Sequence, residues 1–249
     1  MRSRFHFASL ALAAVLVPAA AFAGRGPALV NPARPAQLRP YTMGTPLSTH
    51  IACQLGEVRP VPTYVSGYLF PDEKYYTLLR ISDCPGCGSS GLILTTAHVI
   101  LRFPVACSIP LEVSVIGATV TGNCIVPDES VVICAPVPYN VAPPVAGDYD
   151  VTLNLPAACC IQQNAFLSIR FVSNGLCGTA SLPQLGAAGL PCVPCFTYNQ
   201  NPNFGLVDMC ADPFWPVQAG NPAMFVAADC CDITEAVPHT WGRVKTLYR

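Results

Sequence analysis

Cysteine is the residue whose spacing most invites a chemical interpretation. Two Cys-x-x-Cys strings occur, CPGC at 84–87 and CVPC at 192–195. A redox dithiol of this kind needs a helix N-terminus or an electropositive setting to lower a thiol pKa. A zinc site needs its second pair within ~20 residues. Each string lies among turn residues, and the two strings are far apart in the chain, so we predict structural disulfides at both.

The remaining cysteines support the same prediction. The chain has 14 cysteines, an even number, and in an oxidising compartment such a set forms a disulfide framework whose pairing the sequence leaves open. Neighbours on a strand point to opposite faces, so the doublets Cys159-Cys160 and Cys230-Cys231 should each bond to two different partners. The predicted disulfide cysteines are Cys53, Cys84, Cys87, Cys107, Cys124, Cys134, Cys159, Cys160, Cys177, Cys192, Cys195, Cys210, Cys230 and Cys231.

Carboxylates occur in small groups at 72–73, 128–129, 148/150 and 229/232/235. A glycosidase requires two carboxyl groups ~5–10 Å apart across a cleft. Calcium prefers oxygen ligands of this kind, although no twelve-residue calcium-binding loop is present. We expect solvated turn residues and no cofactor, with a structural calcium ion left open. A hydrolase site assembled from distant residues is the weakest of the functional alternatives.

One short string resembles part of an enzyme. Residues 87–98, CGSSGLILTTAH, look like the segment of the chymotrypsin-like proteases that carries the catalytic histidine, here His98. That resemblance implies a nucleophile in the string Gly-Asp-Ser-Gly-Gly, which this sequence lacks, and a histidine alone activates nothing. Alternation over 92–103 places Ile93, Val99, Leu101 and Phe103 on the core face and His98 on the wetter face. We therefore predict a surface histidine and no catalytic residue.

The segment 196–221 combines aromatic rings with amides and carboxylates. Aromatic faces stack on a sugar ring while the polar groups hydrogen-bond its hydroxyls, so this composition is typical of a site for a neutral polar ligand. The alternative is that the aromatic residues form a small core beneath a long loop, which must bury something to stay ordered. The candidate ligand-binding residues are Tyr198, Phe214, Trp215, Asn199, Asn201 and Asp212.

The N-terminus and the charge balance indicate the compartment and exclude some partners. Residues 1–23 combine Arg2 and Arg4, an apolar stretch at 8–17 and the string Ala-Phe-Ala, which is the pattern of a secretory signal peptide. We predict a secreted, extracellular or periplasmic protein with no stable membrane span after cleavage. Charged residues make up only 11% of the chain and form no basic stripe, which excludes a nucleic-acid partner.

Past the signal peptide, the sequence predicts an arm followed by one β domain. Residues 24–49 are Pro-rich and should form an extended arm, and residues 50–249 should form a disulfide-rich domain. The clearest period-two alternation covers 111–120, 148–155 and 165–173. Less regular strands are expected at 64–70, 75–82, 92–103, 131–135 and 223–228. About eight strands predict an all-β, antiparallel, jelly-roll-like β-sandwich with a long Cys-rich loop region, 174–222, near the C-terminus.

Three functional hypotheses follow from these features. The first is a non-catalytic secreted extracellular module, structural or adhesive, which needs only what the sequence plainly contains. The second is a carbohydrate-binding β-sandwich that uses the 196–221 surface. The third is a secreted hydrolase. The expected partners are a glycan or another extracellular protein.

Overall fold

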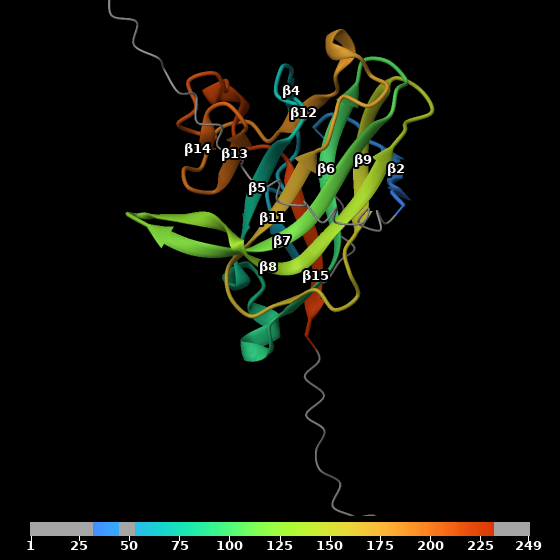
Figure 1. The fold of residues 1–249 in the computed structure, drawn as a ribbon. Helices are drawn as coiled ribbons and strands as arrows, with labels where there is room; N and C mark the ends of the chain where they lie inside the picture. The colour runs from blue at the N-terminus through green and yellow to red at the C-terminus, as the bar shows by residue number, and fades with distance from the viewer. Residues whose placement is uncertain (1–31, 45–52, 232–249) are drawn as a thin grey trace, which may run out of the picture. The chain divides into compact units, whose positions relative to one another are not determined.

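The computed structural model describes residues 32–44 and 53–231 (Figure 1). The predicted signal peptide, residues 1–23, and the arm segments 24–31 and 45–49 lie outside the described residues. The described chain folds into short β-strands joined by turns and by four short 3₁₀ helices. The strands form two sheets.

The first sheet has seven strands and is antiparallel except at one edge, where β1 and β8 run parallel. At its centre β11 lies between β5 and β7, pairing with β5 over Ala165–Phe171 and with β7 over Phe166–Phe171. In spatial order the strands are β1 (Arg34–Pro35), β8 (Cys124–Val141), β7 (Ile109–Thr121), β11 (Ala165–Phe171), β5 (Glu73–Leu79), β13 (Thr197–Asn201) and β14 (Gly205–Asp208).

The second sheet is built around the long strand β6 (Leu92–Phe103). On one side β6 pairs with β9 (Gly147–Asn154), and β9 in turn pairs with β2 (Gln37–Pro40). The other pairings bring in β10 (Cys160–Ile161), β12 (Gln184–Ala187), β15 (Met224–Cys230), β3 (Cys53–Gly56) and β4 (Thr63–Val65).

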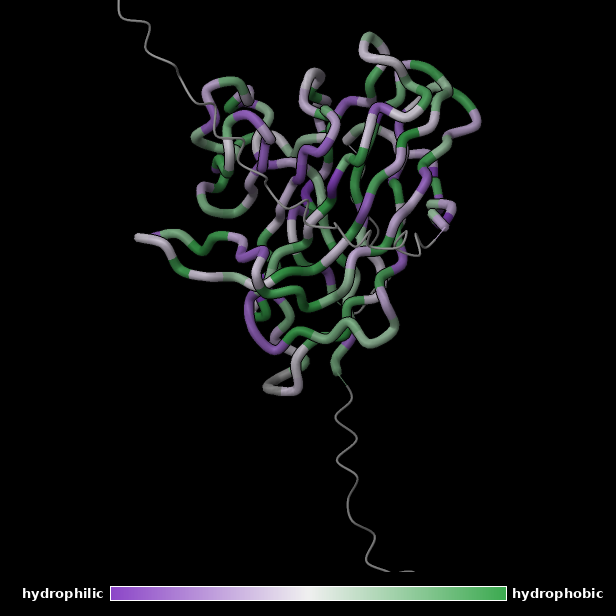
Figure 2. Tube along the Cα trace, viewed as in Figure 1, coloured by the Kyte–Doolittle hydropathy of each residue, from purple (hydrophilic) through white to green (hydrophobic). Residues whose placement is uncertain are grey.

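The two sheets enclose one main hydrophobic core, which confirms the predicted all-β sandwich. Strands β7, β9 and β11 each point every second residue into this core, as their alternation predicts. The core side chains from β7 include Leu111, Val113 and Val115, and those from β9 include Val151 and Leu153. Hydrophobic residues recur along the central strands of both sheets (Figure 2). Most connections cross from one sheet to the other, for example β5 to β6 and β8 to β9, which is typical of jelly rolls.

Strand β6 departs from simple alternation at a β-bulge. Thr96 pairs with Ala227, whereas Ala228 pairs with Leu94, so one extra residue is accommodated in β6. The bulge changes which side chains face inward, and Leu94 rather than Ile93 lies in the core. The prediction of Ile93 on the core face is therefore wrong.

Two segments contain more paired structure than the sequence suggests. Within the Pro-rich arm, β1 and β2 pair with β8 and β9, so the arm is extended but also joins the edge of each sheet. Edge positions tolerate Pro35 and Pro40 because proline has no N–H to donate to a ladder. The region 174–222, predicted as loop, contains β12, β13 and β14.

All fourteen cysteines lie in the described residues and pair with one another, which confirms the disulfide prediction. Neither Cys-x-x-Cys string closes on itself, and both doublets bond to two partners each, as predicted. Such a framework is characteristic of an oxidising compartment outside the cytoplasm. Within the described residues, no helix is both long and apolar enough to span a membrane. The pairs are Cys53–Cys84, Cys87–Cys230, Cys107–Cys177, Cys124–Cys195, Cys134–Cys159, Cys160–Cys231 and Cys192–Cys210.

Candidate functional site

A cavity of about 490 Å³ lies where β5 and β13 meet the segments 67–70 and 212–214. It brings together four of the six predicted ligand-binding residues and adds several that the sequence did not single out. Tyr198 and Trp215 do not line it. The lining residues are Gly67, Tyr68, Phe70, Glu73, Asn199, Asn201, Phe204, Val207, Asp212, Pro213 and Phe214.

Strand β13 supplies the two amides of the cavity because of its period-two geometry. It pairs with β5, with Asn199 opposite Tyr75. Successive side chains point to opposite faces, so Asn199 and Asn201 share one face while Tyr198 takes the other. Tyr198 is buried in a second cluster with Phe166, and its hydroxyl donates to the carbonyl of Ile125 at 2.9 Å. The predicted role of Tyr198 as a ligand-stacking residue therefore has no place in this cavity.

Glu73 is a buried carboxylate that links several residues at the cavity wall. It is 2% exposed, and both of its oxygens accept hydrogen bonds. Oε2 accepts from the backbone N–H of Phe70 at 3.1 Å and from the hydroxyl of Tyr75 at 3.0 Å, and Oε1 accepts from Nδ2 of Asn201 at 2.5 Å. Burial raises the pKa of Glu73 above its ordinary value. The carboxylate thus fixes the turn before β5 to the end of β13.

Two polar atoms at the cavity have no hydrogen-bond partner among the described residues. They are Nδ2 of Asn199, a residue that is only 4% exposed, and the hydroxyl of Tyr68. Burial raises the pKa of Tyr68, so it remains a neutral hydroxyl at ordinary pH. Buried polar groups are nearly always paired in folded proteins. A polar ligand that reaches these atoms therefore offers partners that the protein itself does not.

The rim of the cavity carries exposed aromatic rings. Phe204 is 70% exposed and Phe214 is 72% exposed, and their ring centroids are 6.1 Å apart with planes tilted by 38°. Phe70, also on the rim, is 46% exposed. Large apolar side chains grouped on a surface commonly mark a binding site. These rings offer stacking faces, although the two outermost are tilted rather than coplanar.

Trp215 supports the cavity from behind. Its side chain is buried at 2% exposure, and its Nε1–H donates to the carbonyl of Gly220 at 2.7 Å. Its ring packs edge-on against the ring of Tyr68, with centroids 4.9 Å apart. Trp215 therefore belongs to the main core and positions Tyr68, whereas sequence reasoning placed it at the ligand.

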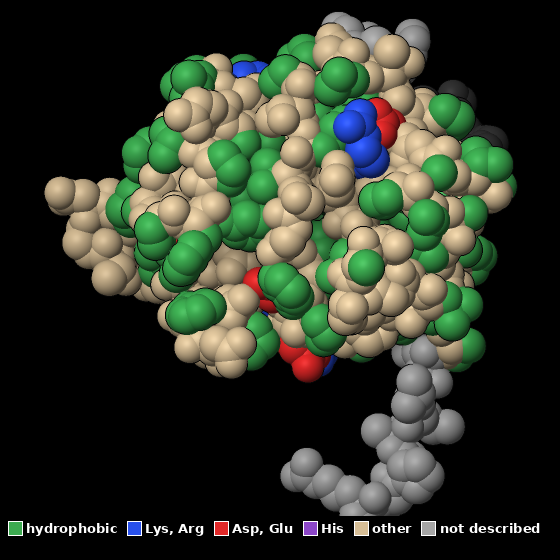
Figure 3. All heavy atoms as spheres, turned by 90° about the horizontal axis from the view of Figure 1, so that it is seen from above, with side chains coloured by type: hydrophobic (Ala, Val, Ile, Leu, Met, Phe, Trp, Pro, Cys, Tyr) green, Lys and Arg blue, Asp and Glu red, His purple; other side chains and the backbone are tan. Residues whose placement is uncertain are grey.

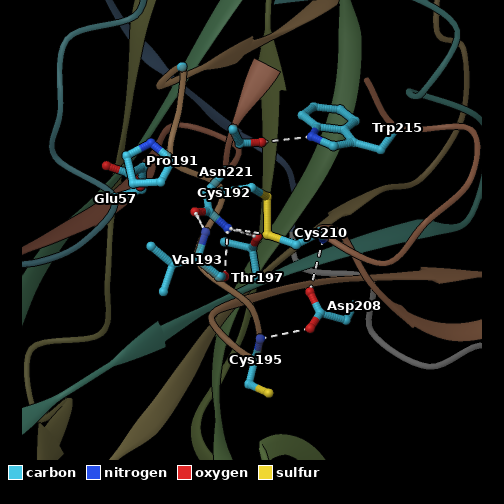
Figure 4. Close-up of a disulfide and its surroundings, with 12 residues drawn as sticks. Glu57, Pro191, Cys192, Val193, Cys195, Thr197, Asp208, Cys210, Trp215 and Asn221 are labelled. Carbon is cyan, nitrogen blue, oxygen red and sulfur yellow. Dashed lines mark hydrogen bonds between the residues drawn. A yellow bond between two sulfur atoms is a disulfide. The ribbon is translucent and has the colours of Figure 1, made fainter. Parts of the chain in front are cut away.

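A disulfide and an asparagine hold the chain around β13 in place (Figure 4). Cys192 bonds to Cys210, which joins the segment before β13 to the segment after β14. The fully buried Asn221 donates through Nδ2 to Thr197 Oγ1 at 2.8 Å and to the carbonyl of Val193 at 3.2 Å. Its Oδ1 accepts from the N–H of Val193 at 2.7 Å. Together these contacts fix the segments that flank β13, in addition to its pairing with β5 and β14.

Asp208, at the end of β14, reinforces the same region. Its two oxygens accept from the backbone N–H groups of Cys195 at 2.7 Å and Cys210 at 3.0 Å (Figure 4). Cys195 is bonded in turn to Cys124, at the first residue of β8. The cavity wall is thereby attached covalently to the β7–β8 hairpin.

His98 is buried, so the prediction of a surface histidine is wrong. Its ring is stacked on Phe225 of β15 with centroids 4.4 Å apart, and the residue is 7% exposed. Nδ1 lies 2.9 Å from Asp150 Oδ1, and Nε2 lies 3.0 Å from Thr96 Oγ1. The outer face of β6 carries its own small hydrophobic cluster, which the alternation pattern does not reveal. None of Thr96, His98 and Asp150 lines the cavity described above.

Two of the carboxylates predicted as solvated turn residues form ion pairs, and one of them, Asp72, is an exposed turn residue as predicted. Asp148 lies on β9 and binds Arg102 at 2.6 Å, and this guanidinium holds the pKa of Asp148 below its ordinary value. Asp72 binds Arg170 at 2.6 Å. Among the described residues, no group of three or more His, Cys, Asp or Glu side chains is arranged to hold a metal ion.

Comparison with known proteins identifies no relative of this chain. No family model, no curated protein and no solved structure matches the chain. A sandwich fold hosts many unrelated activities, so function has to be argued from the cavity itself.

Proposed function

We propose that this protein is an exported, non-catalytic module, adhesive or structural in role, that binds a carbohydrate in the cavity between β5, β13 and segment 212–214. The observation that carries the proposal is the combination of exposed aromatic rings, Phe204 and Phe214, with the amides of Asn199 and Asn201 in one cavity. Sugar rings stack on aromatic faces while their hydroxyls pair with amides and carboxylates.

The size and rigidity of the cavity support this proposal. A volume of about 490 Å³ falls within the range of small-ligand pockets. The disulfide Cys192–Cys210 and the hydrogen bonds of Asn221 hold β13 before any ligand arrives. Preorganisation of this kind lowers the entropy lost on binding.

The bonding of Glu73 favours binding over hydrolysis. Glycoside hydrolysis uses two carboxyl groups that both face the scissile bond. Glu73 is almost fully buried, and its oxygens are occupied by Phe70, Tyr75 and Asn201. Asp212 is then left as the one cavity carboxylate with solvent access, which suits recognition of a ligand rather than acid–base catalysis.

The disulfide framework also supports export through residues 1–23 as a signal peptide. The seven disulfides are characteristic of a compartment in which thiols are oxidised, which is where an exported protein folds. Export with cleavage after Ala23 gives a mature protein that starts at Gly24. N-terminal sequencing of the exported protein that reads Met1 instead would contradict this part of the proposal.

A glycan array probed with the mature protein tests the carbohydrate proposal. We expect binding to one class of glycan, and a strongly reduced signal for Phe214→Ala, which removes an exposed ring without creating a core cavity. Leu176→Ala is the matched control, because Leu176 is 83% exposed and does not line the cavity. Absence of binding to every glycan, or equal binding by Phe214→Ala, would overturn the proposal.

A further inference from the structure

Two further hollows adjoin the cavity and extend it into a groove. One, of about 540 Å³, shares Tyr68 and Phe214 with the cavity. The other, also of about 540 Å³, shares Phe70, Asn201 and Phe204. The neighbouring hollows therefore share wall residues, with Phe214 at one junction and Phe204 at the other. Together the three hollows offer more space than a single sugar ring fills, which favours a chain of sugars as the ligand.

The charge of this groove is entirely acidic. The charged side chains that line the three hollows are Asp72, Glu73 and Asp212, and the lining includes no Lys, Arg or His. Asp72 is neutralised by Arg170, 2.6 Å away. In the described part of the chain, neither Glu73 nor Asp212 takes part in an ion pair. Figure 3 views the end where β13, β14 and β4 lie in Figure 1, and its surface is largely hydrophobic or uncharged.

Asp212 is placed to receive a cation. Its Oδ1 accepts the backbone N–H of Phe214 at 2.8 Å, and Oδ2 accepts no hydrogen bond from the described residues. The exposed ring of Phe214 follows two residues later on the same rim. An ammonium group gains both from a carboxylate, through charge-assisted hydrogen bonds, and from an aromatic face, through cation–π attraction.

We infer that the groove binds a chain of amino sugars whose amino groups are free and protonated. This inference rests on the proposed carbohydrate-binding function and names its ligand class. The aromatic rims stack the sugar rings, and Asp212 pairs with an ammonium group near the middle of the groove. Acidic glycans are excluded because Asp212 and the buried Glu73 repel them and no basic side chain in the lining compensates.

Calorimetric titration of the full mature protein at about pH 6 tests the inference, because amines are protonated there. The probes are β-1,4-linked trisaccharides of glucosamine and of N-acetylglucosamine, which differ at the amino groups. We expect the glucosamine trisaccharide to bind roughly tenfold more tightly, and this preference to shrink at high salt, where exposed charges are screened.

Asp212→Asn is the decisive variant. An asparagine keeps the Oδ1 acceptor for the N–H of Phe214, so the turn is retained while the charge is lost. We expect this variant to lose the preference for the glucosamine trisaccharide. The matched control is Asp83→Asn, which neutralises an exposed aspartate in the 3₁₀ helix Ile81–Asp83 that lines none of the three hollows.

The outcomes separate this inference from the function on which it rests. Equal or tighter binding of the N-acetylglucosamine trisaccharide overturns the amino-sugar inference and leaves carbohydrate binding standing. A preference that survives in Asp212→Asn also overturns it, because the charge is then not what selects the ligand. If neither these trisaccharides nor any arrayed glycan binds, both the inference and the proposed function are overturned.

Discussion

Glu73 is the residue on which the geometry of the cavity depends most. It accepts hydrogen bonds from the backbone N–H of Phe70 and the amide of Asn201, both on the cavity wall, and from the hydroxyl of Tyr75 in the core. Burying a carboxylate is costly unless hydrogen bonds replace its lost hydration. The three donors offset that cost, so Glu73 acts as a structural crosslink between residues 128 positions apart.

The raised pKa of Glu73 gives stability a defined pH dependence. Because its pKa is higher in the folded protein than the ordinary value of 4.5, the folded state binds more protons between the two values. The free energy of unfolding therefore falls as pH rises through that window, by about 1.4 kcal/mol for each unit of pKa difference, and is flat above it.

Glu73→Gln removes the titrating carboxyl group and so tests whether Glu73 causes this pH dependence. Because Glu73 contributes a fall in the free energy of unfolding as pH rises, we expect the slope of that free energy against pH to become more positive in the variant from pH 4.5 upward, measured by denaturant unfolding up to about pH 7. We also expect a loss of roughly 1–3 kcal/mol, because the new NH₂ group faces a hydrogen-bond donor, either Asn201 Nδ2 or the N–H of Phe70. The disulfides stay intact during the measurement. An unchanged slope would show that another carboxyl group controls the acid response.

A second prediction at the residue scale concerns the buried His98. His98→Phe keeps a ring that can stack on Phe225 but deletes the hydrogen bonds to Asp150 and Thr96. Leaving the partly buried carboxylate of Asp150 without its partner should lower the free energy of unfolding by about 1–3 kcal/mol, measured by denaturant unfolding. Equal stability of the variant and the parent would mean that stacking alone accounts for His98.

At the scale of elements, β13 and its flanking segments form the wall that decides binding. Strand β13 has only β14 beyond it in the sheet, and its flanks are held by the Cys192–Cys210 disulfide and by Asn221 rather than by neighbouring strands. Cavity shape should therefore depend on this disulfide more than on the central sheets.

The double variant Cys192→Ala/Cys210→Ala tests that dependence. It removes a disulfide that closes a loop of 18 residues, and the expected loss in the free energy of unfolding is about 3 kcal/mol. We expect hydrogen exchange to rise in β13 and β14 while β6 and β9 keep their protection, and glycan affinity to fall. The control, Cys107→Ala/Cys177→Ala, removes a disulfide that closes a loop of 70 residues and should lower the free energy of unfolding by about 4 kcal/mol. It should nevertheless keep the affinity of the parent protein for the glycan. The reverse pattern of affinities would contradict this view of the wall.

The elements that the sequence predicts well are those whose signal is local. Strands β7, β9 and β11 each carry a run of alternating residues, and each is found close to its predicted bounds. Strand β6, whose pattern is less regular because of its bulge, is also found at its predicted bounds. Strand β13, with the sequence Thr-Tyr-Asn-Gln-Asn, is rich in amide residues that are rare in strands, so propensity hides it. What places it in the sheet is pairing with β5, more than a hundred residues earlier, which no local pattern records.

The residues of the candidate site also fall into those that the local sequence identifies and those that it does not. Asn199, Asn201, Asp212 and Phe214 were identifiable because aromatic and polar types cluster in one segment, and they do meet at one cavity. Glu73 and Tyr68 reach it from the other end of the chain, and nothing in their local sequence marks them. Trp215 and Tyr198 were misplaced because composition does not say which side of a strand or turn is buried.

At the scale of the whole molecule, seven disulfides and two sheets make a rigid support for one apolar groove. The covalent links join distant parts of the chain, for example Cys87 to Cys230. Because the disulfides restrict the chain, exposed rings such as Phe204 and Phe214 can remain at the surface. In a more flexible chain such rings would turn inward and become buried. We propose that these exposed rings hold a carbohydrate.

The affinity of the double variant Phe204→Ala/Phe214→Ala for the best arrayed glycan, measured by calorimetric titration beside the parent protein, tests that claim most directly. Stacked aromatic contacts contribute on the order of 1 kcal/mol each beyond the area they bury, so we predict a loss of roughly 10- to 100-fold in affinity with unchanged thermal stability. An affinity equal to that of the parent protein would contradict the account, because the groove would then not be where the glycan binds.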